Sequence, residues 1–561
     1  TGGQHTAVGR NALNSITTAS ENTAVGYYAA SSMTTGTQNT AIGNQAMIAA
    51  TTGSYNTAVG SYALDAAVTG SSNTAVGHQA LSLNTSGQNN VAIGKEALEA
   101  NTTADHNTAV GAVALHLNTT GTHNQAVGNY ALQNCTTGSY NIGLGYNTLG
   151  GVTTQSNNVA IGDAALESCT AANNTAVGYR SLYANTTGSE NVAVGRVALD
   201  ANTTGIENTA LGAGALSANT TASNNTAIGS NAALSNTTGT GIVAIGHDCL
   251  EGNSTGSYIT AIGYEAYKSG SASGDHNIAI GVQAMYTNTT GTLNVAVGNY
   301  ALDANTTGDS NVAIGRNALS ANTTANNNTA VGKDALESNT TGTQNTAVGS
   351  NALDVNTTAD NNCAFGSSSL GLNTTGANNA AYGQGSLGAN TTGANNIAVG
   401  GLSLQGNTTG SQNTAVGYKS LYTNTTAGSN TAVGEEALYA NTTGSLNVAV
   451  GKDSVQANTT GDRNTGLGAN ALNANTTGSY NTAVGYGALL VNTTGTNNTA
   501  VGYNALDANT TASYNTAVGD DALGSTTTGD ANTVIGYHAM AANTTGDNNN
   551  AHGYGALDEN T

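Results

Sequence analysis

Residues 39–55 read NTAIGNQAMIAATTGSY, and this 17-residue stretch decides the fold because close copies of it fill the whole chain. Its glycine, Gly43, returns with the same 17-residue period from Gly9 to Gly553. Two intervals differ, one that is one residue short near 172–174 and one that is one residue long near 270–276. This gives 33 repeats. A short fixed period is the signature of a solenoid, in which each unit contacts only its neighbours.

The period also predicts the domain organisation. We expect residues 1–561 to form a single continuous repeat array and to be a window of a longer protein, with a one-residue deletion near 172–174 and a one-residue insertion near 270–276. At a strand spacing of about 4.8 Å, 33 stacked turns would form a rod on the order of 160 Å long. A catalytic domain is not expected in such an array.

The repeat is numbered from its opening Asn, so that residues 39–55 occupy positions 1–17. The consensus is N-T-A-V-G-x-x-A-L-x-x-N-T-T-G-x-x, with Val or Ile at position 4 and Leu or Met at position 9 in almost every repeat. Short β-rich segments between turn residues are typical of strands and not of helices. We therefore predict an all-β protein, a parallel β-solenoid (β-roll) of about 33 turns, each turn being one 17-residue repeat.

The two large apolar side chains of each repeat are predicted to form the core. Position 3, next to position 4, is Ala in nearly every repeat. Because adjacent strand residues point to opposite faces, we expect the Ala face to pack closely against a second surface, either another strand layer or, as we favour, another chain. The predicted core residues include Val25, Ile93 and Val297 at position 4 and Leu64, Leu98 and Leu302 at position 9.

Position 5 is Gly in all 33 repeats, whereas position 15 accepts Ala, as at Ala104. This contrast predicts a positive φ or a very close approach of two backbones at position 5 only. We expect a corner of the coil at this position, for example at Gly26, Gly43, Gly60, Gly94 and Gly315.

Position 12 is usually Asn and is most often followed by Thr-Thr, which creates a column of glycosylation sequons. In other repeats the position holds Ile16, Met33, Val152 or Cys169, which indicates an inward side chain. Stacked Asn side chains can hydrogen-bond along a coil as a ladder. We favour this ladder over a glycan for Asn84, Asn101, Asn118, Asn305 and Asn475.

Composition narrows the possible partners. The chain has no Pro, no Trp, 75 Gly and only 7% charged residues, with a net charge of −21 and only 10 Lys and Arg together. A shortage of cationic side chains argues against nucleic acid or an anionic membrane as a partner. No apolar stretch reaches the length of about 18 residues that a membrane-spanning helix needs.

Chemical motifs are weak. Cys135 and Cys169 occupy one column two turns apart, about 9.6 Å at the usual strand spacing, so we expect all four cysteines to be free. His106 and His123 lie one turn apart beside Asp105, too few convergent ligands for a metal. A recurrent turn carboxylate suggests calcium, but solvated turn aspartates are the favoured interpretation. It occurs as Asp105, Asp309, Asp462 and Asp547. We predict no catalytic, metal or cofactor-binding site, no cofactor and no enzyme activity.

Three segments resemble a known family: residues 90–94 (NVAIG), 191–195 (NVAVG) and 311–315 (NVAIG). They are similar to the head repeats of trimeric autotransporter adhesins, and related arrays occur in tail-fibre proteins of phages. The resemblance implies a left-handed β-roll with three chains side by side at the tip of a bacterial surface fibre. This chain differs in its longer return segment with Thr-Thr-Gly, and we expect no neck, coiled-coil stalk or membrane anchor of the adhesin type within residues 1–561.

Tyrosine is the residue type that could carry recognition, because exposed rings can stack on sugars. The alternative, which we favour, is that these rings cover strand ends. Tyr27, Tyr146, Tyr179, Tyr264, Tyr418 and Tyr486 follow the corner Gly, and Tyr55, Tyr140, Tyr480 and Tyr514 precede the opening Asn.

The expected function is a non-enzymatic structural repeat region of an extracellular fibre or filament at a cell surface or on a virion. It would act in surface adhesion or as a rigid shaft. Expected partners are further copies of the chain, as a trimer or as an end-to-end filament, and surface glycans. Alternatives are the shaft of a phage tail fibre and an ice-binding solenoid, although Val91, Gln125, Ile142 and Cys363 interrupt the Thr column at position 2 that ice binding requires.

Overall fold

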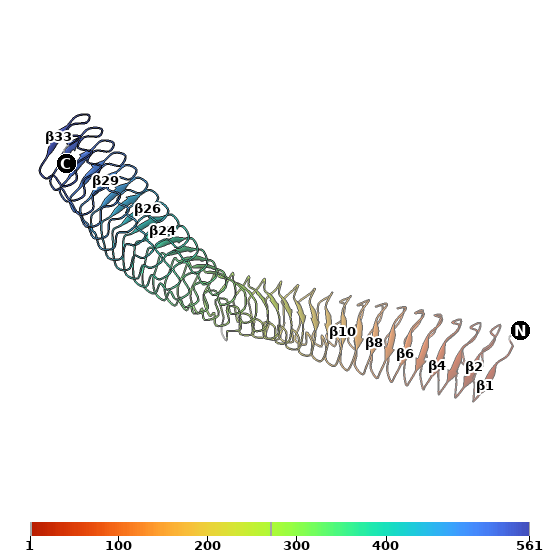
Figure 1. The fold of residues 1–561 in the computed structure, drawn as a ribbon. Coiled ribbons are helices and arrows are strands. Elements are labelled where there is room, and N and C mark those ends of the chain that lie inside the picture. The colour runs from red at the N-terminus through yellow and green to blue at the C-terminus, as the bar shows by residue number, and fades with distance from the viewer. Residues whose placement is uncertain (1–2, 270–271, 560–561) are drawn as a thin grey trace. The chain divides into compact units, whose positions relative to one another are not determined.

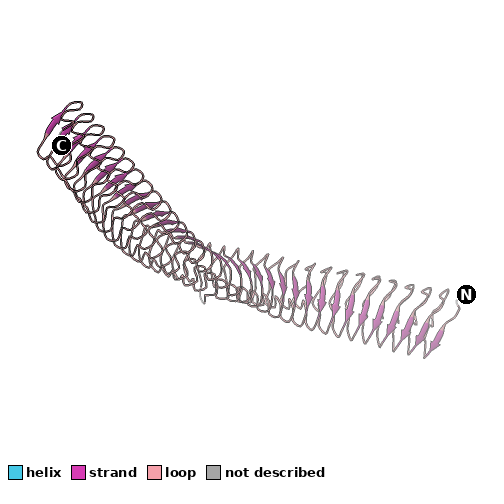
Figure 2. Ribbon diagram, viewed as in Figure 1, coloured by secondary structure: helices cyan, strands magenta, loops and turns pink. Residues whose placement is uncertain are grey.

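The computed structural model describes residues 3–269 and 272–559, and these residues form a parallel β-solenoid without any helix (Figure 1). The chain divides into two compact units, Thr1–Asn277 and Ile278–Thr561. In both units each turn carries one three-residue strand, and the remaining residues form turns and loops (Figure 2). The predicted all-β parallel solenoid, with its 17-residue turn repeated about 33 times, is confirmed.

The strands occupy positions 2–4 of the repeat. In the first unit they are β1 (Thr6–Val8), β2 (Thr23–Val25), β3 (Thr40–Ile42), β4 (Thr57–Val59), β5 (Thr74–Val76), β6 (Val91–Ile93), β7 (Thr108–Val110), β8 (Gln125–Val127), β9 (Ile142–Leu144), β10 (Val159–Ile161), β11 (Thr175–Val177), β12 (Val192–Val194), β13 (Thr209–Leu211), β14 (Thr226–Ile228), β15 (Val243–Ile245) and β16 (Thr260–Ile262).

In the second unit the strands are β17 (Ile278–Ile280), β18 (Val295–Val297), β19 (Val312–Ile314), β20 (Thr329–Val331), β21 (Thr346–Val348), β22 (Cys363–Phe365), β23 (Ala380–Tyr382), β24 (Ile397–Val399), β25 (Thr414–Val416), β26 (Thr431–Val433), β27 (Val448–Val450), β28 (Thr465–Leu467), β29 (Thr482–Val484), β30 (Thr499–Val501), β31 (Thr516–Val518), β32 (Thr533–Ile535) and β33 (Asn550–His552).

Consecutive strands of a unit pair in parallel and in phase with the repeat. Ala41 of β3 is opposite Ala58 of β4, one full repeat later. At the deletion near 172–174 Ala160 is opposite Ala176, one residue short of a full repeat, so the loop absorbs the missing residue and the register of the strands is kept. At the insertion near 270–276 the backbone N–H of Ser257 donates to Asp275, one residue beyond a full repeat. Residues 270 and 271 of this insertion lie outside the described residues.

The apolar core consists of Ala at positions 3 and 8 and Leu at position 9. Leu64, Leu98 and Leu302 are fully buried, which confirms their prediction as core residues. The prediction for position 4 is wrong. Ile93 is 40% exposed, and Val25 and Val297 are only half-buried, because these side chains point out of the coil while the Ala beside each of them points inward.

The inner face of the strand holds small residues because the interior is narrow at position 3. A Cβ added at Gly143 of β9 would lie 2.7 Å from Thr148 Oγ1 and 3.5 Å from Leu132 Cδ1. A Cβ at Gly466 of β28 would lie 2.7 Å from Val455 Cγ2. The side chains at positions 8 and 9 already occupy much of this space, so the inner face favours a small residue, and β32 is an exception with a buried Val534 at this position.

The corner at position 5 is confirmed by both properties that were predicted for it. Gly94 has φ +139°, and a Cβ added to it would lie 2.3 Å from the carbonyl oxygen of Gly111. The predicted restriction of positive φ to position 5 is wrong, since the same turn has positive φ at Glu96, Leu98 and His106 (+58°, +50° and +61°). Those angles lie in the left-handed region that L-residues adopt at some cost, whereas +139° is accessible only to glycine.

The Asn ladder at position 12 is confirmed. Asn101 Nδ2 donates to Asn84 Oδ1 at 2.9 Å, and Asn118 Nδ2 donates to Asn101 Oδ1 at 3.0 Å. Asn305 and Asn475 bond in the same way to the Asn one turn earlier, at 2.7 and 2.8 Å. All five predicted ladder residues are fully buried, so their sequons are closed to glycan attachment in the folded chain.

A second ladder, at position 1, was not predicted from the sequence. Asn73 Oδ1 accepts the backbone N–H of Asn90 at 3.1 Å. The carbonyl oxygen of Gly87, at position 15, accepts the amides of both Asn73 and Asn84, at 2.9 and 3.0 Å. The two ladders thus meet at the same carbonyl in the interior, and the near-constant Asn that opens each repeat was the signal for this arrangement.

The turn that carries the insertion repairs the ladder with a different residue. Tyr267 replaces the usual Leu at position 9 and is fully buried. Its hydroxyl donates to the carbonyl of Gly274 at 3.2 Å and accepts the amide of Asn277 at 3.2 Å. A buried polar group without a partner is costly, so the tyrosine hydroxyl compensates for the disturbed Asn column.

Candidate functional site

The outer face of the sheet, formed by the side chains at positions 2 and 4 of the strands, is a regular surface that continues from strand to strand in each unit. These residues align in columns because each strand pairs with the same positions of the next. Position 4 exposes large apolar side chains such as Ile42 (40%), Leu211 (46%) and Val450 (39%). A parallel sheet usually has both faces covered, so an apolar outer face of this kind is a candidate contact surface.

The outer face carries no Asp, Glu, Lys or Arg on any of the described strands, although the chain as a whole has a net charge of −21. Position 2 holds Thr, Val or Ile on most strands, and aromatic rings replace the aliphatic side chains of position 4 on β22 and β23. The rings of Phe365 and Tyr382 stack there with centroids 5.0 Å apart. The face is therefore uncharged and mixes hydroxyl, aliphatic and aromatic groups.

The predicted docking of the Ala face against another chain is wrong. Ala at position 3 is buried inside its own coil, for example at Ala92, which is fully buried between more exposed neighbours on its strand. The surface available for contact is therefore the position 4 face, whose residues were predicted to form the core.

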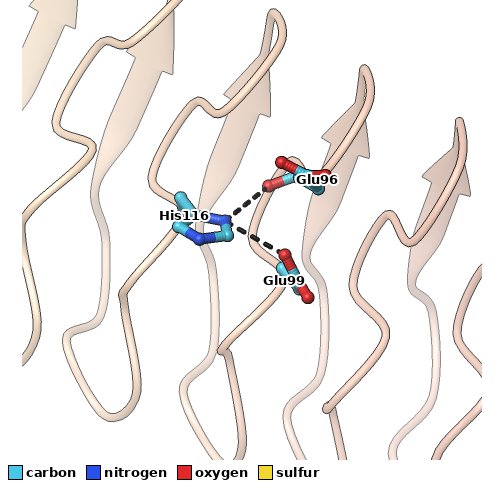
Figure 3. Close-up of side chains that lie close together, drawn as sticks. All are labelled: Glu96, Glu99 and His116. Atoms are coloured by element: carbon cyan, nitrogen blue, oxygen red, sulfur yellow. Dashed lines mark hydrogen bonds and ion pairs between the residues drawn. The ribbon is translucent and has the colours of Figure 1, made fainter.

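One group of side chains has the composition of a metal site (Figure 3). Glu96 and Glu99 belong to one turn and His116 to the next, and their ligand atoms lie within 4.8 Å of one another. His116 Nδ1 lies 3.2 Å from Glu99 Oε2 and 3.3 Å from the backbone carbonyl oxygen of Glu96. Lys95 Nζ lies 3.0 Å from Glu96 Oε1, and this hydrogen bond is the main reason why the pKa of Glu96 is lowered.

The same column holds ion pairs and hydrogen bonds elsewhere. His116 is at position 10, and so are Lys268 and Gln456, which also reach carboxylates of their own turn or the previous turn. In each case the nitrogen of the position 10 side chain forms a hydrogen bond or ion pair with carboxylates of the same chain. We therefore interpret Glu96, Glu99 and His116 as a variant of this repeated contact.

The carboxylates predicted to be turn aspartates have a structural role. Asp105, Asp309 and Asp462 each accept the backbone N–H of the residue one turn earlier, at 2.6 to 2.7 Å. Asp547 does the same for Asp530 at 2.6 Å. These bonds link neighbouring turns at the surface.

The two histidines of neighbouring turns, His106 and His123, stack on one another. Their ring centroids lie 4.9 Å apart, and Tyr140 continues the stack at 4.9 Å from His123. The rings thus add a further contact between successive turns.

The predicted tyrosines are exposed on the surface but do not gather into one site. Those that follow the corner Gly, such as Tyr146 and Tyr179, are 55% and 53% exposed. Tyr55 and Tyr514, before the opening Asn, are 62% and 65% exposed. Most are separated by several turns, and the stacked pair Tyr486 and Tyr503 is an exception, with centroids 5.5 Å apart.

The four cysteines are free, as predicted. Cys135, Cys169 and Cys249 are buried, and burial raises the pKa of the Cys135 and Cys249 thiols to about 11 and about 12. A thiol that stays protonated is a poor nucleophile and a poor metal ligand, so these residues serve as small core side chains.

Among the described residues no helix has the length and apolarity to cross a bilayer. No protein-family model matches the chain, and a search of curated proteins gives no match either.

Proposed function

We propose that the chain is the non-enzymatic structural repeat region of an extracellular fibre, in which copies of the chain associate through the outer face of the sheet. The observation that carries this proposal is the continuous, uncharged and partly apolar column at position 4. Its mechanism would be mechanical reach combined with many weak contacts, either in surface adhesion at a cell surface or as a shaft on a virion.

Charge supports a second copy as the occupant of the outer face. Two chains with a net charge of −21 each repel one another wherever their charged loops meet. The outer face is free of Asp, Glu, Lys and Arg on every described strand, so it is a surface on which copies can meet without placing like charges in contact. Burial of aligned Val and Ile would then provide the stabilising free energy.

The favoured assembly is a trimer with the position 4 columns at its axis. The resemblance to adhesin head repeats at residues 90–94, 191–195 and 311–315 supports this number of chains. A phage tail-fibre shaft would use the same surface. An ice-binding face would need an unbroken Thr column, and Cys363, Ala380 and Ile397 interrupt it on three consecutive strands, so this alternative is less well supported.

The proposal is tested by mass per length in electron micrographs, together with sedimentation of charge variants. The wild-type chain is expected to show a mass of about three 17-residue repeats, one from each of three chains, for each 4.8 Å of rise. The double variant Val433→Asp, Val450→Asp places carboxylates on the outer face and should sediment as a monomer with an unchanged circular dichroism spectrum. The control Ala469→Asp adds a carboxylate at position 6, where Asp163 already occurs naturally, and should still assemble. A wild-type chain that remains monomeric at all concentrations would overturn the proposal.

A further inference from the structure

A recurring contact in the solenoid shows what the position 10 column binds. Lys268 Nζ lies 2.7 Å from Glu265, 3.2 Å from Asp248 and 3.5 Å from Glu251, which are at positions 7 and 10 of the same and the previous turn. Gln456 Nε2 makes the equivalent contacts to Glu436 and Asp453, at 2.7 and 3.2 Å. In both places an N–H donor of one turn satisfies the carboxylates around it.

At Asp354 this donor is missing. Asp354 is at position 10 of its turn, and the next two turns have Gly371 and Gly388 at the same position. Asp354 Oδ1 is buried and has no hydrogen-bond partner among the described residues. A Cβ added at Gly371 would lie 3.7 Å from this oxygen, so a side chain there would extend toward it as Lys268 extends toward Glu251, the position 10 carboxylate of its previous turn, at 3.5 Å.

The absent side chains leave a cavity of about 330 Å³ in the second unit. Asn351, Asp354 and Gln405 are polar residues that line it, and Gln405 lies two turns further along the chain than Gly371. Leu372 and Ala389 provide apolar contact. The volume is within the range of small-molecule sites, roughly 300 to 1,000 Å³. An anionic group in a partly apolar cavity suits a ligand with a cationic head and a short aliphatic chain.

We propose that this cavity binds a primary alkylammonium group, such as the end of a lysine side chain or a small amine, with the ammonium on Asp354 Oδ1. The bound ammonium takes the place that Lys268 Nζ occupies beside Glu251, the position 10 carboxylate of the previous turn. At this cavity the position 7 residues are Asn351 and Ser368, so Asp354 supplies the carboxylate. The methylene groups lie along Leu372 and Ala389, and the missing side chains at position 10 of these turns leave the space for them. This inference does not depend on the proposed association of the chains.

The experiment uses dansylcadaverine, a fluorescent primary amine, titrated with the full-length chain and followed by fluorescence polarisation at constant ionic strength. The wild-type chain should bind saturably, and n-butylamine should compete whereas n-butanol should not. Asp354→Asn should weaken binding roughly ten-fold or more, because the charge-assisted hydrogen bond is lost. Asp65→Asn, a matched change at position 10 of a turn outside the cavity, should leave binding unchanged.

A second pair of variants separates loss of the site from loss of the fold. Gly371→Lys supplies an internal ammonium and should abolish binding of the probe while keeping the thermal stability of the wild-type chain. Gly388→Gln fills the cavity without charge and should also block binding. Circular dichroism reports the folding of each variant. Polarisation that does not saturate, or that is the same for wild-type and Asp354→Asn, would overturn the proposal.

Discussion

At the scale of the residue, the solenoid depends on backbone conformations that few side chains tolerate. Gly94 represents the corner, where φ is +139° and the next turn's carbonyl oxygen would lie 2.3 Å from an added Cβ. Leu98 in the same turn adopts φ +50°, a left-handed conformation with a cost of about 1 kcal/mol for an L-residue. The turn accepts the cost at Leu98 because its side chain is fully buried in the core.

We expect Gly94→Ala to destabilise the first unit by more than about 2 kcal/mol, since both the conformation and the space for a Cβ are unfavourable. Urea unfolding followed by circular dichroism measures the effect. Gly121→Ala is the control at position 15, where a Cβ would also approach a carbonyl oxygen, that of Gly138 at 2.1 Å, but where φ is not positive. Ala104, one turn earlier, shows that the backbone at position 15 adjusts to a methyl group. Equal losses of stability for the two variants would contradict the special role of the corner conformation.

At the scale of the element, the strand was predictable and the loop that follows it was not. The repeat period and the corner Gly could be inferred from the recurrence of residues 39–55, and the Asn ladder from the Asn that most other repeats have at position 12. Which face of the strand points into the coil could not be inferred, because Val at position 4 and Ala at position 3 are compatible with either face. The width of the interior decides between them, and width depends on how Leu132 and its equivalents pack across the coil.

The loop also creates a column of half-buried carboxyl groups that the sequence does not reveal. At position 10 burial is the largest cause of a raised pKa in five aspartates spread over both units, namely Asp65, Asp200, Asp303, Asp354 and Asp507. These groups are part of a turn that looks solvent-exposed in sequence. The residues at positions 7 and 9 of this turn are mostly in the left-handed region, a conformation that the sequence does not reveal either.

Asp303 gives a prediction for the pH dependence of stability. Burial raises its pKa to about 6 from an ordinary value of 3.8. A carboxyl whose pKa is higher in the folded state binds its proton more tightly there, so it favours folding at low pH, and this contribution is lost as the pH rises from about 4 to 6. Asp303→Asn should therefore raise the melting temperature at pH 7 and leave it nearly unchanged at pH 4.

Thermal unfolding of both chains at several pH values between 4 and 8 measures this difference. Asp520→Asn, at an exposed position in the same unit, is the matched control and should leave the pH profile unchanged. A gain from Asp303→Asn that is the same at pH 4 and pH 7 would show that the lost charge is not the cause.

At the scale of the whole molecule, stability is a sum of contributions from neighbouring turns. Strands pair with those of the adjacent turns, and the Asn ladders link the same turns through buried hydrogen bonds. In such a quasi-one-dimensional array, removal of one complete 17-residue repeat leaves an equivalent contact between the two turns that then become neighbours. The deletion near 172–174 shows that strand register is kept even when one loop loses a residue.

We expect excision of residues 312–328, one complete repeat in the second unit, to give a chain that folds with nearly the same melting temperature as the full-length protein. The cut joins Asn311 to Thr329, so the sequence Asn-Thr-Ala-Val-Gly is restored and β18 can pair with β20 in the usual register. Excision of residues 312–319 instead removes about half a turn and leaves Val297 and Val331 without a shared register. This second chain should lose cooperative unfolding or aggregate. Differential scanning calorimetry compares the three chains, and a large loss of stability after the complete excision would mean that coupling extends beyond nearest-neighbour turns.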